Sequence, residues 1–138
     1  MTILLDTSVL VAAFTKDAQS ERAEQWLDRA APFLVSDWAA AEFSSAIRNK
    51  VRQGYLEAPL VPEIETFFDA WSHRQGGNRP VVSADHVTAR LLVSQHAGLR
   101  APDALHLAIA LRLRAVMATF DQQQQDAALA EGLEVFAP

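Results

Sequence analysis

The chain begins MTILLDTSVL (residues 1–10), in which three apolar residues are followed at once by an acid. The segment 3–5 is too short for a helix and is apolar on both faces, which predicts a strand inside a parallel sheet. Asp6 is then expected at the carboxyl end of that strand, where open α/β sheets place their ligands. An aspartate at such a turn more commonly only caps the next helix, for which Thr7 and Ser8 are also suited. The choice between these interpretations depends on whether other acids reach the same place.

Apolar segments typical of strands alternate with amphipathic segments typical of helices along the rest of the chain. Strands are expected at 3–5, 33–35, 80–82, 115–120 and 133–136. A short helix or turn is expected at 9–14, and helices at 20–30, 38–53, 59–76, 84–97, 102–111 and 122–129. This alternation predicts an α/β fold with a mainly parallel sheet of about five short strands and helices on both faces. A length of 138 residues fits one domain, 1–138, and no linker or internal repeat is visible.

A second acid follows a second strand, because Asp121 comes directly after the segment 115–120. Right-handed crossovers bring the ends of parallel strands to one edge of the sheet, so Asp6 and Asp121 are expected together. Asp103 lies in the first turn of the strongly apolar helix 102–111, where backbone N–H groups favour an anion. Glu42 lies within the apolar stripe of the helix 38–53. Spacing alone does not establish that these two acids reach the same edge.

Each of these acids also has a simpler interpretation. Burying a lone carboxylate costs several kcal/mol unless it is paired or bound to metal. Glu42 is therefore expected at a metal site, at the edge of the buried face, or in a salt bridge, for which Arg48 and Arg22 are the candidate partners. Asp103 could be an ordinary helix-start aspartate. His106 shares the face of Asp103, and we interpret it as a packed, hydrogen-bonded histidine and not as a metal ligand.

The composition is that of a globular protein with a modest negative charge. Twelve Lys plus Arg against seventeen Asp plus Glu give a net charge of −5, which by itself argues against a nucleic-acid binder. If four acids belong to a metal site, however, the remaining thirteen nearly balance the bases, and the metal cancels the charge of the site. There is no cysteine, no recognisable signal peptide and no apolar run near the roughly 20 residues of a membrane span. We therefore expect a soluble, cytoplasmic protein with no membrane partner.

Four stretches carry a resemblance that covers essentially the whole chain. They are residues 5–10 (LDTSVL), 41–43 (AEF) with Ala46, 102–108 (PDALHLA) and 118–121 (ATFD). Each is weak alone, but together and in this order they resemble PIN domains, and specifically the VapC-type toxins of type II toxin–antitoxin pairs. The resemblance implies a three-layer PIN-like sandwich.

The resemblance also implies an endoribonuclease that depends on Mg²⁺ or Mn²⁺. It assigns Asp6, Glu42, Asp103 and Asp121 as the catalytic, metal-binding set, with Ser8 and Thr119 in support. A cluster of carboxylates without His or Cys agrees with this, because hard divalent cations prefer oxygen ligands. Such a cation activates water for attack on a phosphodiester.

Partners are implied in the same way. RNA is the expected substrate, held by some of the cations Arg48, Lys50, Arg52 and Arg100, although a solvated face is the simpler interpretation of these residues. A VapB-type antitoxin is the expected inhibitor, with a homodimer and a larger toxin–antitoxin assembly.

Other functions remain open or are disfavoured. A catalytically silent binding module with the PIN fold is one alternative, and a PIN nuclease that acts on DNA or in RNA processing is another. A haloacid-dehalogenase-type phosphotransferase needs a second aspartate where Ser8 stands, and a receiver domain needs one where Ser83 follows the segment 80–82. The glycine-rich turn of a dinucleotide-binding fold is missing.

Overall fold

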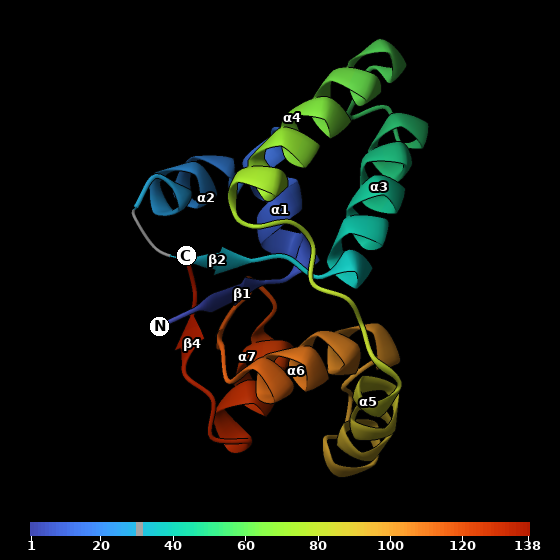
Figure 1. Cartoon of the computed structure of the whole chain (residues 1–138). Coiled ribbons are helices and arrows are strands. Elements are labelled where there is room, and N and C mark those ends of the chain that lie inside the picture. The colour runs from blue at the N-terminus through green and yellow to red at the C-terminus, as the bar shows by residue number, and fades with distance from the viewer. Residues whose placement is uncertain (30–31) are drawn as a thin grey trace.

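The computed structural model describes residues 1–29 and 32–138, and within them a parallel four-stranded sheet forms the centre of the molecule (Figure 1). The strands are β1 (Ile3–Leu5), β2 (Phe33–Leu34), β3 (Val116–Ala118) and β4 (Val135–Phe136), in the order β2-β1-β3-β4. Ile3 is in register with Phe33 on one side and Val116 on the other, and Leu5 is in register with Ala118. The first strand is therefore interior, as predicted, and β4 is at an edge.

Helices cover both faces of this sheet, giving the predicted three layers (Figure 1). One layer holds α1 (Thr7–Phe14), α2 (Ser20–Leu27), α3 (Asp37–Arg52), the short 3₁₀ helix η1 (Ala58–Leu60) and α4 (Val61–Arg74). The other holds α5 (Ser83–Gln95), α6 (Ala101–Leu113) and α7 (Gln122–Ala130). None of the helices in the described segments is long and apolar enough to cross a membrane.

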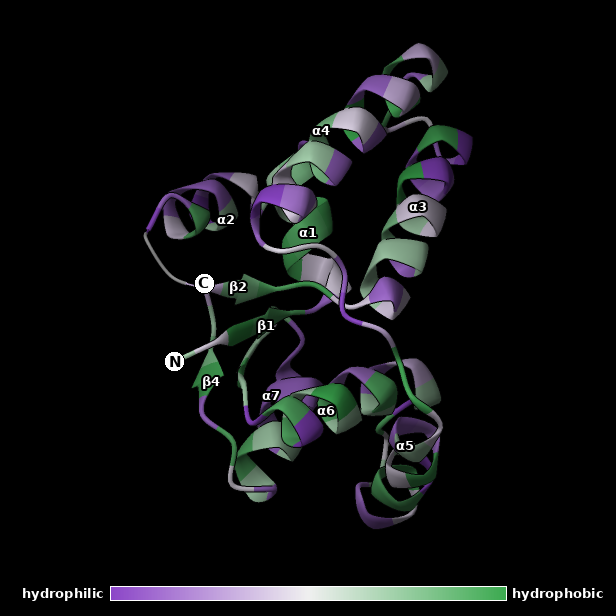
Figure 2. Ribbon diagram, in the orientation of Figure 1, coloured by the Kyte–Doolittle hydropathy of each residue, from purple (hydrophilic) through white to green (hydrophobic). Residues whose placement is uncertain are grey.

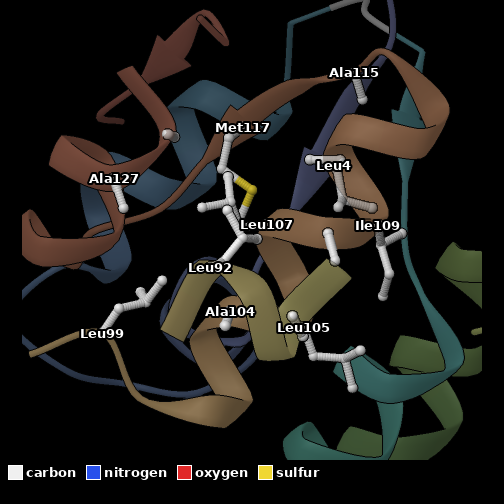
Figure 3. Close-up of a cluster of buried hydrophobic side chains, with 14 of the residues drawn as sticks. Leu4, Leu92, Leu99, Ala104, Leu105, Leu107, Ile109, Ala115, Met117 and Ala127 are labelled. Carbon is white, nitrogen blue, oxygen red and sulfur yellow. The ribbon is translucent and has the colours of Figure 1, made fainter. Parts of the chain in front are cut away.

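Alternation along β1 separates two hydrophobic cores, because successive side chains of a strand point to opposite faces. Leu4 packs with Leu107 and Met117 against α5, α6 and α7 (Figure 3). Ile3 and Leu5 belong to the second core, beneath α1 to α4. The strands and α6 are mainly hydrophobic along their length (Figure 2), which explains why α6 is buried on most of its circumference.

The strand predicted at 80–82 is wrong, so the described sheet has four strands and not five. Arg79 makes only an isolated parallel bridge with Ser36. Pro80 has no N–H, and the N–H groups of Val81 and Val82 donate to the side chains of Asp37 and Asp85 (both 3.0 Å). The backbone donors that a strand would need are therefore used by carboxylates.

The helix predicted at 20–30 is shorter than expected and ends at Leu27, with residue 30 outside the described residues. Ser20 is its first helical residue, and the hydroxyl of Ser20 donates to the carbonyl of Thr15 (2.8 Å). The other helices begin and end within a few residues of their predicted bounds.

Candidate active site

The four predicted acids come from four separate elements. Asp6 and Asp121 are the N-cap residues of α1 and α7, and they follow the adjacent strands β1 and β3 at the same edge of the sheet. Asp103 lies in the first turn of α6, and Glu42 lies in the middle of α3. The two strand-end acids therefore share an edge as predicted, and the other two approach from opposite layers.

Asp6 is the most enclosed of the four, with an exposed fraction of 4%. Its Oδ1 accepts hydrogen bonds from Ser8 Oγ (2.5 Å) and the Val9 N–H (3.3 Å), and its Oδ2 accepts one from Thr119 Oγ1 (2.6 Å). Burial nevertheless raises the pKa of Asp6 above its ordinary value, because these hydrogen bonds only partly replace the lost water. Asp6 is thus both a helix cap and a buried, electrostatically costly carboxylate.

Ser8 and Thr119, the predicted supporting residues, connect the ends of β1 and β3. Ser8 Oγ donates to Asp6 and accepts from the Phe120 N–H (3.1 Å). Thr119 Oγ1 donates to Asp6 and accepts from the Asp121 N–H (3.0 Å). Both hydroxyls therefore fix where Asp6 and Asp121 stand relative to each other.

Glu42 is half-buried and is held by α1 and α6. Its Oε1 accepts a hydrogen bond from Thr7 Oγ1 (2.7 Å) and contacts Nε2 of His106. Burial raises the pKa of Glu42, but the hydrogen bonds from His106 and Thr7 outweigh it, and the net pKa lies below the ordinary glutamate value. The predicted salt bridges are not formed, since Arg48 pairs with Glu65 (2.7 Å) and Arg22 lies over the ring of Phe120.

Asp103 experiences the charge of all three other acids. Its pKa is raised first by burial and then by repulsion from Asp121, Asp6 and Glu42. Asp103 is therefore close enough in space to each of these three acids to be repelled by it, although the four are far apart in the sequence.

Asp121 uses one carboxylate oxygen to cap the N-terminus of α7. Its Oδ1 accepts from the N–H groups of Gln123 (2.9 Å) and Gln124 (3.2 Å) in the first turn of α7. Gln124 in turn is fully buried, and its Nε2 donates to the backbone carbonyl of Asp103 (3.1 Å). This contact ties the first turns of α6 and α7 together beside the acids.

The donor chemistry of the site fits a hard divalent cation, because it consists of carboxylate and hydroxyl oxygens. A cation would also relieve the repulsion that raises the pKa of Asp103. Across the part of the chain that the structure describes, however, no three His, Cys, Asp or Glu side chains are grouped so that they hold a metal as they stand. Oxygens of Asp6 and Glu42 are instead engaged by the side-chain donors described above.

The predicted RNA-binding cations are not gathered at the acids. Lys50 lies near Asp17 (3.8 Å), and Arg48 is paired with Glu65. Arg52 bonds to Asn49, and the carboxyl end of α3 that carries these residues lies away from the sheet (Figure 1). Arg100 is exposed at the N-cap of α6, immediately before the turn that holds Asp103.

An apolar groove of about 870 Å³ lies beside the site, between the first turns of α3 and α6 and one side of α5. Two of its lining residues are joined by a hydrogen bond, from the indole N–H of Trp38 to the carbonyl of Pro102 (3.3 Å), and His86 and Arg90 also line it. This groove was not predicted from the sequence, because its walls come from segments far apart in the chain.

Three contacts of the site were also missed. Thr7 was expected only near a helix start, and no role was predicted for Gln124. His106 was predicted as a packed, hydrogen-bonded histidine, which is confirmed, but its partner Glu42 was not predicted. The shared helical face of His106 and Asp103 was the one available signal. Contacts between α3 and α6, or between α6 and α7, depend on tertiary packing and leave no periodicity in the sequence.

The fold and the site define a class of α/β protein in which helices cover both faces of a parallel sheet and acids lie at the carboxyl ends of its strands. The family model described as PIN domain matches residues 3–129. The chain belongs to the PIN domain family.

Solved structures with the same fold are similar over nearly the whole chain. The FitAcB structure from Neisseria gonorrhoeae is similar at 21% identity and a TM-score of 0.62, covering 99% of this chain and 97% of that one. Mycobacterium tuberculosis VapC20, described as a sarcin-ricin loop cleaving toxin, is similar at 16% identity and a TM-score of 0.69, covering 99% of each chain. VapBC2 from Rickettsia felis, bound to a DNA fragment from its promoter, is similar at 13% identity and a TM-score of 0.70, covering 99% of this chain and 98% of that one. No match is found among curated proteins.

Proposed function

We propose that this chain is an endoribonuclease toxin of a toxin–antitoxin pair, dependent on Mg²⁺ or Mn²⁺. The observation that carries the proposal is the geometry that brings the four acids toward one edge of the sheet. Asp6 and Asp121 follow the adjacent strands β1 and β3. Gln124 of α7 bonds to the backbone of Asp103, and Glu42 contacts His106, which lies one helical turn after Asp103. The raised pKa of Asp103, to which the other three acids contribute, agrees with this arrangement. Membership of the PIN family and the toxins among the structural neighbours support the same function.

The residues of the site have separable roles in this proposal. Asp6, Glu42, Asp103 and Asp121 would hold the cation, and Ser8 and Thr119 keep Asp6 and Asp121 in place. When bound, the cation supplies Lewis acidity for attack of water on the phosphodiester. Of the four predicted cations, Arg100 is the one next to an acid of the site, because it is exposed at the N-cap of the helix that carries Asp103, and it would contact a substrate phosphate. Arg48, Lys50 and Arg52 would contact only a longer RNA.

The test is cleavage of total cellular RNA by the purified protein with Mg²⁺, with Mn²⁺ and with chelator. Asp6→Asn and Asp103→Asn are compared with Asp69→Asn, which removes an exposed acid of α4 outside the site. Metal-dependent products that vanish in the first two variants and persist in the third are expected. Intact RNA under every metal contradicts the enzyme proposal.

The proposed partners are a VapB-type antitoxin, a second copy of the chain and a larger toxin–antitoxin assembly. Two structural neighbours support this proposal: VapC20 is described as a toxin, and VapBC2 is described as bound to a DNA fragment from its promoter. Induced expression of the wild-type chain in a bacterium is expected to arrest growth, whereas Asp103→Asn is not. Arrest by both proteins would contradict a toxin whose action depends on the acidic site.

A silent binding module is the second candidate, and one observation favours it. The described acids are not grouped as a ready-made metal site. In that case the protein neither binds Mn²⁺ nor cleaves RNA. The cleavage experiment separates the two candidates directly.

A further inference from the structure

His106 and Glu42 join two layers of the molecule at the acidic site. His106 is on α6 with an exposed fraction of 1%, and its Nε2 contacts Oε1 of Glu42 on α3. Thr7 Oγ1, at the start of α1, donates to the same Oε1 (2.7 Å) and lies 3.3 Å from the same Nε2. Three elements therefore meet at a single carboxylate oxygen.

The surroundings of His106 indicate which ring nitrogen carries the proton. Its Nδ1 is buried and has no hydrogen-bond partner within the described structure. A proton on Nδ1 would be a buried donor without an acceptor, whereas a lone pair there costs less. The Nε2–H form also supplies the donor that Oε1 of Glu42 accepts. Trp38, whose ring centroid lies 6.5 Å from that of His106, is bonded to α6 through Pro102 and packs beside the imidazole.

These donors restrict the rotation of the Glu42 carboxylate. Oε1 is held by both Thr7 and His106, so the plane of the carboxyl group is set by α1 and α6 and not by α3 alone. Hydrogen bonds of this kind orient carboxylate ligands of metals, and their removal typically weakens metal affinity about 10- to 100-fold.

We infer that His106, assisted by Thr7, is a positioning residue that fixes the Glu42 carboxylate for divalent-cation binding. The inference rests on the proposed function, because it takes Glu42 as a ligand. In this role His106 does not bind the cation; its Nε2–H donates a hydrogen bond to Oε1 of Glu42.

The first test uses metal-free protein. Long-range ¹H–¹⁵N spectra of the imidazoles, with the His106 signals assigned from their loss in His106→Gln, report which nitrogen is protonated. A protonated Nε2 and an unprotonated Nδ1 are expected, with a clear change in the Nε2 signal in Glu42→Gln. An unprotonated Nε2, or a signal insensitive to Glu42→Gln, overturns the inference.

The second test is Mn²⁺ binding measured by calorimetry, with folding checked by circular dichroism and thermal unfolding. His106→Leu and Thr7→Val are expected to weaken Mn²⁺ binding by about tenfold or more. His106→Gln and Thr7→Ser keep a donor and should restore part of the affinity, which a purely structural role would not require. Asp69→Asn is the control and should bind as the wild type does.

The outcomes distinguish this inference from the proposed function. If His106→Leu and His106→Gln fold and bind Mn²⁺ as tightly as the wild type, and the wild type cleaves RNA, then the positioning role alone is overturned. A wild type that binds Mn²⁺ in a His106-dependent way but leaves RNA intact supports the positioning role and contradicts the nuclease. A wild type that binds no Mn²⁺ overturns both.

Discussion

Asp6 and Asp103 are two aspartates with raised pKa values that arise from different surroundings. Asp6 is enclosed and accepts three hydrogen bonds, so burial dominates its pKa. Asp103 is less enclosed, and repulsion from three acids adds to the effect of burial. Replacing the two should therefore have different consequences for the metal-free fold.

Asp103→Asn is expected to stabilise the metal-free protein at neutral pH, raising its Tm by a few degrees. A carboxyl whose pKa is raised on folding binds its proton more tightly in the folded state, so the free energy of unfolding falls as pH rises from the ordinary aspartate pKa to the raised one. The stability gain of Asp103→Asn over the wild type should therefore be small in acid and should grow with pH to a plateau. Urea unfolding across this range, in chelator, measures it. A gain that is constant or that shrinks with rising pH contradicts the raised pKa.

Thr119→Val is expected to destabilise the fold by about 2 to 4 kcal/mol, since it leaves Oδ2 of Asp6 and the N–H of Asp121 without their partner. Thr119→Ser keeps the hydroxyl and loses one buried methyl group, which costs about 1 kcal/mol. The comparison, by urea unfolding, separates the hydrogen bonds from packing. Equal losses in the two variants would show that the hydroxyl contributes nothing.

The placement of Asp6 and Asp121 could be predicted from the sequence because each acid follows a short apolar segment, and neighbouring parallel strands end at one edge. The partner of Glu42 could not be predicted. Arg48 and Arg22 were the cations expected from the charge pattern, whereas the observed partner, His106, comes from another layer. Which donor reaches a half-buried carboxylate depends on how α3 packs beside α6, and a single sequence does not encode that legibly.

At the scale of the elements, the segment 80–82 shows where pattern reasoning failed. Its apolar residues match the pattern of a buried strand, but a strand needs free backbone N–H groups to pair with its neighbour. Here the side chains of Asp37 and Asp85 accept the hydrogen bonds of those N–H groups. The segment instead leads into α5, whose N-terminus is fastened to α6 by the buried side chain of Asp85. Arg112 makes a two-point contact with that carboxylate (2.8 and 2.9 Å) and also donates to the carbonyl of Pro80 (3.0 Å).

Asp85→Asn is expected to cost about 2 to 3 kcal/mol at neutral pH, because it breaks this charged, two-point contact. Burial raises the pKa of Asp85, but the hydrogen bonds from Arg112 and the Val82 N–H outweigh it, and the net pKa lies below the ordinary value. The stabilisation is therefore present above the unfolded pKa of about 3.9 and is lost as pH falls through the lower folded pKa. The difference between the wild type and Asp85→Asn should accordingly shrink in acid.

Urea unfolding at neutral and acidic pH measures that difference. Arg112→Lys keeps the charge but not the planar fork, so it should fall between the wild type and Asp85→Asn. A loss for Asp85→Asn that is the same at both pH values would exclude the ionised pair as its cause.

At the scale of the whole molecule, the charge distribution explains how an acidic protein can be proposed to act on RNA. The net charge is −5, with seventeen acids against twelve bases. Four of the acids belong to the proposed site, and the remaining thirteen nearly balance the twelve bases. The positive charge of a bound divalent cation would offset much of the repulsion among the carboxylates of the site. Cation binding should therefore be visible in the stability of the whole domain and not only in catalysis.

Mn²⁺ is expected to raise the Tm of the wild type on the order of 10 °C at about 100 times its Kd, where binding to the folded state contributes about 2.7 kcal/mol. Asp103→Asn starts from a higher metal-free Tm, because it lacks the repelled carboxylate, but it should gain little from Mn²⁺ because it also lacks a ligand. The order of the two melting temperatures should therefore reverse on adding Mn²⁺ and return with chelator. Asp69→Asn should follow the wild type throughout. Equal gains in the wild type and Asp103→Asn would place the cation elsewhere, since only a cation bound among these carboxylates links the repulsion at Asp103 to metal affinity.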